Sequence, residues 1–130
     1  MRQIVRFSTT AMLSLLITAG TSAAATTLAS SLIVSAPAEA LECRITNVGT
    51  KPITLGTVPQ FFDSSGTLVS AGTDCAPSIP LAPGSSCFSF AGPGSFSAYC
   101  AVSFSSSKKA VRGSLSRTDG NRTLFAVPLQ

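Results

Sequence analysis

Cysteine content constrains this chain more than any other feature. Its four cysteines all lie after residue 42, namely Cys43, Cys75, Cys87 and Cys100. An even number of cysteines in a small exported domain is typical of a disulfide framework. Zinc is the competing interpretation, but the sequence has no C-x-x-C pair and no histidine. We therefore predict two disulfides and no metal site.

The first forty residues have the organisation of a secretory signal. A basic start precedes the apolar stretch Ala11–Gly20, and an A-x-A pattern formed by Ala38 and Ala40 closes the segment. We therefore expect residues 1–40 to be a signal peptide that is cleaved before Leu41. The remaining residues, 41–130, suffice for a single domain. Because a signal peptide directs export, we expect a secreted or periplasmic location.

Two other fates of this leader stay open. Cleavage after the alanines Ala23–Ala25 would leave a floppy arm rich in Ala, Ser and Thr. An uncleaved membrane anchor is the second alternative, because Ala11–Val34 is long enough to span a bilayer. Gly20, Pro37 and many hydroxyl side chains dilute the hydrophobicity of that segment, so we favour cleavage.

Alternating apolar and polar residues predict strands in the rest of the chain. The clearest is the segment 96–104, in which one face carries Phe96, Ala98, Cys100, Val102 and Phe104. We expect it to be a central strand. The segment 41–47 alternates in the same way and places Cys43 on its buried face. We therefore favour the pair Cys43–Cys100, with a second pair, Cys75–Cys87, that closes the proline-rich and irregular stretch 71–87.

The other segments complete an all-β pattern. Further strands are expected at 53–58, in a hairpin over 60–70, and at 85–90, 110–117 and 123–129. Asp119-Gly120 is a strong hairpin signal between the last two of these strands. About seven short strands, with no helical period anywhere, predict an antiparallel β-sandwich.

Two turn motifs carry a resemblance to a known group of domains. "ITNVGTKPITLGTV" and "LAPGSSCFSF" resemble the N-x-G-x-x-P and L-x-P-G-x-S turns of immunoglobulin-like domains in exported bacterial proteins. The matching residues are Asn47, Gly49, Pro52, Leu81, Pro83, Gly84 and Ser86. The resemblance implies an immunoglobulin-like sandwich used for adhesion, scaffolding or surface display, with no catalytic residues. The chain lacks the core tryptophan of antibody-type domains.

Catalytic chemistry finds little support in the sequence. Histidine, the commonest general base, is absent. Ser-x-x-Lys occurs twice, at Ser105/Lys108 and Ser106/Lys109, but in a predicted loop and without the partner motifs of penicillin-recognising enzymes. The acids are separated in sequence, and two of them, Asp63 and Asp119, fall in predicted turns. We expect neither an enzyme nor a cofactor.

A basic group is the strongest candidate for a binding function. It consists of Lys108, Lys109, Arg112, Arg117 and Arg122. Such a group can hold an anionic surface polymer through long-range attraction, although basic residues also protect loops and sheet edges from aggregation. Residues 41–130 carry a net charge of only +3, too little for a dedicated nucleic-acid binder.

Three roles are therefore compatible with the sequence. The first is an exported structural or binding domain without catalytic activity, whose partner could be another envelope protein. The second is a weak anion- or polysaccharide-binding module. The third is an enzyme inhibitor, because a disulfide-closed loop over 75–87 would be pre-organised for binding.

Overall fold

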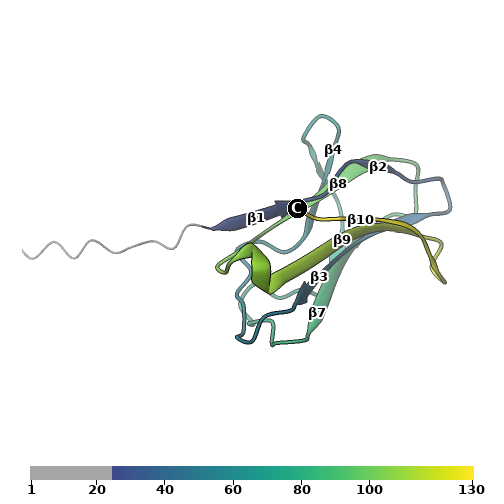
Figure 1. Cartoon of the computed structure of the whole chain (residues 1–130). Helices are drawn as coiled ribbons and strands as arrows, with labels where there is room; N and C mark the ends of the chain where they lie inside the picture. Colours follow the sequence, from purple (N-terminus) through teal and green to yellow (C-terminus); the bar gives the residue numbers. More distant parts are fainter. Residues whose placement is uncertain (1–24) are drawn as a thin grey trace, which may run out of the picture.

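A computed structural model of the chain describes residues 25–130 (Figure 1). Its elements are strands and one short 3-10 turn. In chain order they are β1 (Thr26–Ala29), β2 (Ile33–Val34), β3 (Ala40–Asn47), β4 (Gln60–Asp63), β5 (Leu68–Val69), β6 (Gly72–Thr73), β7 (Ser86–Ala91), β8 (Ser97–Phe104), the turn η1 (Lys108–Ala110), β9 (Val111–Thr118) and β10 (Thr123–Pro128).

The strands form two antiparallel sheets that pack as a sandwich (Figure 1). One sheet has the order β1-β8-β4-β5, and β2 also pairs with β8. The other has the order β10-β9-β3-β7-β6. The all-β, antiparallel expectation is confirmed, but the predicted number of about seven strands is wrong, because residues 25–130 contain ten.

The core lies between the sheets and follows the predicted alternation. In β8, every second side chain from Ala98 to Phe104 is fully buried, and in β3 the same holds for Leu41, Cys43 and Ile45. A disulfide joins Cys43 of one sheet to Cys100 of the other, so the core carries a covalent link between its two layers.

The second disulfide joins Cys75 to Cys87, and both pairs are those that the sequence favours. It connects the chain just after β6 to the start of β7. Most of the stretch between them is irregular, as expected. Within the predicted irregular segment 71–87, however, Gly72–Thr73 pairs with β7 as a short strand.

The segment 53–58 does not form the predicted strand. Ile53 pairs with Leu81 in a single bridge, whereas Leu55 pairs with Phe104 of β8. The segment joins β3 of one sheet to β4 of the other and belongs to neither ladder. Its alternation was nevertheless informative, because Ile53 and Leu55 are both buried.

The predicted leader boundary at residue 41 falls inside β3, whose first residue is Ala40. Residues 25–40 belong to the described structure and supply β1 and β2, so two of the three strands that sequence analysis did not expect come from this segment. Residues 1–24, with most of the predicted leader, lie outside the described residues. Within residues 25–130, no helix is long and apolar enough to cross a membrane.

Candidate anion-binding surface

The basic residues Lys108 and Lys109 lie in the 3-10 turn η1, onto which a second loop packs. The backbone N–H groups of Val48 and Gly49 both donate to the carbonyl oxygen of Ala110, at 2.9 and 3.2 Å. A Cβ atom on Gly49 would lie 2.9 Å from the Cβ of Ala110, so this close approach requires glycine.

Asn47 fixes the shape of that second loop. Its buried side-chain amide donates to the carbonyl oxygens of Lys51 and Leu81, each at 2.8 Å. Its side-chain oxygen accepts from the N–H of Gly49, and its backbone carbonyl accepts from the N–H of Gly84. The two turn motifs identified in the sequence therefore meet at one asparagine, which brings Lys51 beside η1.

A shallow depression of about 310 Å³ opens between this loop and η1. Lys51 and Lys109 line it together with three hydroxyl-bearing side chains. Those are Thr50, Ser106 and Ser107. A smaller hollow of about 140 Å³ lies on the neighbouring outer face of β3 and β9, where Arg44 and Arg112 contribute to its lining.

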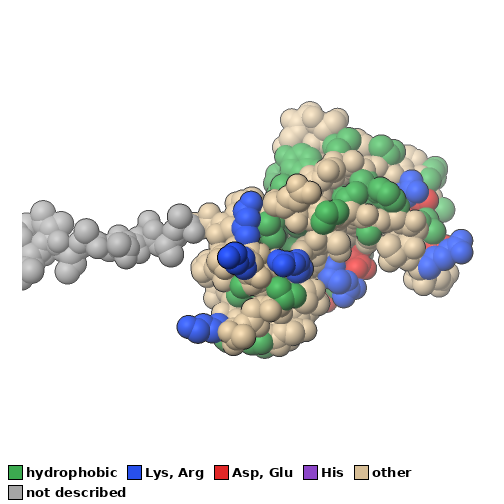
Figure 2. Space-filling model, in the orientation of Figure 1, with side chains coloured by type: hydrophobic (Ala, Val, Ile, Leu, Met, Phe, Trp, Pro, Cys, Tyr) green, Lys and Arg blue, Asp and Glu red, His purple; other side chains and the backbone are tan. Residues whose placement is uncertain are grey.

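These cations form what we call the basic end, defined as Lys51, Lys108, Lys109 and Arg112. Figure 2 shows Lys and Arg side chains gathered over the region of η1 and the start of β9. Within residues 25–130, none of the four has a carboxylate partner within 4 Å, whereas Arg44 pairs with Glu42 at 2.8 Å. The basic end therefore presents charge that no neighbouring acid neutralises.

The structure divides the basic group that the sequence indicates. Arg117 and Arg122 lie toward the far end of β9, and each pairs with an acid, Arg117 with Glu39 at 3.3 Å and Arg122 with Asp119 at 3.2 Å. Arg117 also pairs opposite the buried Leu41, so it occupies an inward-facing position of β9. Only three of the five predicted residues belong to the basic end.

Sequence reasoning missed Lys51. It precedes Lys108 by more than fifty residues, and only the contact between the two loops brings them together. The N-x-G turn was the available signal, because it predicts a fixed loop at Asn47.

Two acids serve turns rather than chemistry. Asp63 accepts hydrogen bonds from the hydroxyl and N–H of Ser65 and from the N–H of Thr67, and the Ser65 hydroxyl is the largest cause of its lowered pKa. Asp119 likewise has a lowered pKa, chiefly through the N–H of Asn121. Hydrogen bonds to the charged form explain both directions.

The Ser-x-x-Lys pairs do not form a catalytic arrangement. They span a loop and η1, and the N–H and hydroxyl of Ser105 are both directed to the carbonyl oxygen of Thr54, at 3.1 and 3.4 Å. That spacing brings serine and lysine together on a longer helical turn, which this segment does not make.

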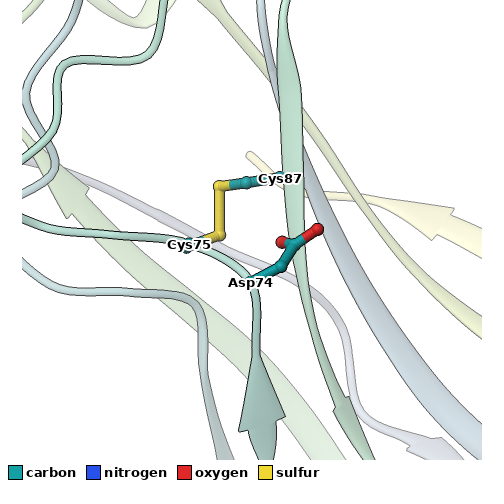
Figure 3. A group of neighbouring side chains, drawn as sticks. All are labelled: Asp74, Cys75 and Cys87. Carbon is teal, nitrogen blue, oxygen red and sulfur yellow. A yellow bond between two sulfur atoms is a disulfide. The ribbon is translucent and has the colours of Figure 1, made fainter.

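One cluster in the described part of the chain has the composition of a metal site. Asp74, Cys75 and Cys87 place their potential ligand atoms within 4.8 Å of one another (Figure 3). The two sulfurs are bonded to each other and therefore offer no thiolate. The carboxylate of Asp74 accepts the N–H of Phe88 at 2.6 Å, so its observed role is to hold the chain against β7.

The disulfide-closed loop 75–87 borders a hollow of its own, of about 300 Å³. Its lining includes Leu55 from the segment 53–58 and Ile79 and Leu81 from the loop. Ile79 is 67% exposed, so the loop presents an apolar side chain to solvent.

Comparisons with protein-family models, with curated proteins and with solved structures find no match, so the geometry alone supports the function proposed below.

Proposed function

We propose that this chain is an exported, non-catalytic binding domain that holds an anionic polymer, such as an acidic polysaccharide, at its basic end. The observation that carries the proposal is the set of four cations without acidic partners around η1. Hydroxyl groups of Thr50, Ser106 and Ser107 beside Lys51 and Lys109 add hydrogen-bond donors for oxyanions.

Open geometry favours a polymer over a small molecule. The depression at η1 is shallow and the hollow at Arg112 is small, whereas sites for small ligands usually enclose most of the ligand surface. A polymer can instead contact several separated cations at once, and each contact adds to the total attraction.

Export is the second part of the proposal. Two disulfides are consistent with an oxidising compartment, in which such bonds form and persist. A stapled sandwich with a binding surface at one end suits a protein that works outside the cytoplasm.

We further propose that the fold is a variant of the immunoglobulin-like sandwich. The order β3-β7-β6 and the pair β4-β8 correspond to strands B-E-D and C-F of that fold, and Cys43–Cys100 corresponds to its B–F disulfide. The strand that follows F differs, because β9 pairs with β3 in the opposite sheet. The place beside β8 is taken by β1 and β2.

Retention on immobilised dextran sulfate tests the anion-binding part. The double variant Lys51→Gln/Lys109→Gln removes two cations that line the depression. We expect its affinity to fall about tenfold at moderate ionic strength, since each exposed ion pair contributes up to about 1 kcal/mol. The difference should shrink as salt is raised, because salt screens exposed charges.

Arg117→Gln/Arg122→Gln is the matched control, because it removes the same net charge from the other end of the molecule. Circular dichroism of both variants tests whether they are folded. Equal losses in the two variants would mean that net charge alone drives retention, and the basic end would then not be a site.

The disulfide-closed loop supports a second candidate, inhibition of an enzyme, because Ile79 is exposed on a segment whose ends are bonded together. A loop held in one conformation loses less entropy on binding. Enzyme binding that survives high salt and is lost in Ile79→Ser would favour this role over anion binding.

A further inference from the structure

The segment before residue 41 covers the outer edge of β8 over its whole length. β1 pairs Thr26 with Phe104 and Ala29 with Ala101, and β2 pairs Ile33 with Ala98 and Val34 with Ser97. The register shifts by one residue between these two ladders, which is the geometry of a single antiparallel strand with a bulge. Residues 26–34 therefore act as one strand.

At the bulge this strand still satisfies the backbone of β8. The N–H of Ser30 donates to the carbonyl oxygen of Cys100, and the N–H of Cys100 donates to the Ser30 hydroxyl, both at 2.9 Å. Ser30 thus holds Cys100, which forms the inter-sheet disulfide with Cys43. Cleavage before Leu41 would remove Ser30.

The same segment also closes the sandwich at this side. Ala29 and Gln130 exchange two backbone hydrogen bonds, of 3.1 and 2.9 Å, which connect β1 to the residues after β10 in the other sheet. Leu28 and Ile33 are buried in the core at 4% and 7% exposure.

The residues between β2 and β3 are fixed as well. The Ser35 hydroxyl donates to the carbonyl oxygens of Gly94 and Phe96, and Glu39 pairs with Arg117. The bond from Ala40 to Leu41 lies inside β3, where Ala40 pairs with Thr118. Removal of residues 26–40 would leave the edge of β8 unpaired. It would also leave two cavities in the core, where Leu28 and Ile33 are buried.

We infer that the export signal is cleaved after Ala25, so that the mature protein begins at Thr26, the first residue of β1. In this reaction water adds across the Ala25–Thr26 peptide bond, giving a carboxylate on Ala25 and a free amine on Thr26. The exporting cell's signal-processing protease supplies the catalysis. Small residues stand at the required positions, with Ala23 at −3 and Ala25 at −1.

The boundary also agrees with the fold on its other side. Ala25 is exposed and precedes the first ladder pair, so cleavage there removes none of the described strands. The residues of the A-x-A pattern at Ala38 and Ala40 have a structural role instead. Ala40 begins β3, and Glu39 between the two alanines forms an ion pair with Arg117. The inference rests on the export proposed above, and its readout does not depend on anion binding.

Intact mass of the exported protein tests this inference. The full chain, with its own leader, is expressed in a bacterium and recovered from the exported fraction under non-reducing conditions. We expect the mass of residues 26–130, lighter by two hydrogens for each disulfide. A mass that begins at Leu41, or the mass of the uncleaved chain, would overturn the inference.

Two substitutions locate the processing site independently of folding. Ala25→Lys places a long, charged side chain at −1, so we expect loss of the product that begins at Thr26. Ala40→Lys makes the same change at the other pattern, and its product should still begin at Thr26. The reverse result, with processing lost only in Ala40→Lys, would contradict cleavage after Ala25. Denaturing electrophoresis and mass report the cleavage even if a variant does not fold.

Discussion

Asn47 is the residue on which the basic end depends most. It is fully buried, and its side chain satisfies two carbonyl oxygens and one N–H in two loops that are distant in sequence. Buried polar groups that lose their partner cost about 1–3 kcal/mol. An asparagine in this position therefore stabilises the fold and positions Lys51 at the same time.

We expect Asn47→Ala to lower the free energy of unfolding by about 2 kcal/mol, or the melting temperature by roughly 10 °C. The carbonyl oxygens of Lys51 and Leu81 would lose their donor. Thermal unfolding followed by circular dichroism measures the effect. Thr46→Ala is the control, because Thr46 is a neighbour on the same strand whose hydroxyl contacts only the exposed hydroxyl of Ser86. Equal melting temperatures for the two variants would contradict the role of Asn47.

At the level of elements, the two disulfides constrain very different lengths of chain. Cys43–Cys100 closes a loop with a sequence separation of 57 and joins the two sheets. Cys75–Cys87 has a separation of 12 and closes a single irregular segment. The entropy that a cross-link removes from the unfolded chain grows with loop length.

We therefore expect Cys43→Ala/Cys100→Ala to lower the stability by about 4 kcal/mol and Cys75→Ala/Cys87→Ala by about 3 kcal/mol. The first pair also leaves space in the fully buried core, which adds to its cost. Urea unfolding of both double variants against the parent gives the two differences. A larger loss from the shorter loop would show that loop length does not determine the order.

Elements that stay in one sheet could be predicted from the sequence, because their alternation is a local property. The segment 96–104 became β8 and 41–47 became β3, with the expected faces buried. The segment 53–58 has the same alternation but joins β3 of one sheet to β4 of the other, and a local pattern does not report the partner of a strand. The same reason applies to the basic end, since the contact between the loops of Gly49 and Ala110 is long-range.

β1 and β2 could not be predicted from the sequence for a different reason. Residues 26–34 are "TTLASSLIV", an uncharged mixture of aliphatic and hydroxyl-bearing residues, and they follow an uncharged stretch of similar composition. Composition cannot separate the end of a leader from an adjacent buried strand. Only pairing with β8 distinguishes the two, and pairing is visible in the structure alone.

At the scale of the whole molecule, the two sheets are connected both through the core and at one edge of the sandwich. The disulfide at Cys43 joins them through the core, and the exchange between Ala29 and Gln130 joins them at an edge. In the basic end, Lys51 lies in a loop, Lys108 and Lys109 lie in η1, and Arg112 lies at the start of β9. We therefore expect that loss of the segment at this edge lowers the stability of the protein more than it alters the basic end.

A chain that begins at Leu41 tests this dependence. It lacks the side chains of Leu28 and Ile33, whose burial contributes about 3–6 kcal/mol together, against a total stability of about 5–15 kcal/mol for a typical domain. It also exposes the unpaired edge of β8, and such edges associate with other chains. We expect no cooperative thermal transition near that of the chain beginning at Thr26, together with aggregation in size-exclusion chromatography. A monomer that melts at the same temperature as the longer chain would show that residues 26–40 are dispensable for stability, and that the two sheets do not need them.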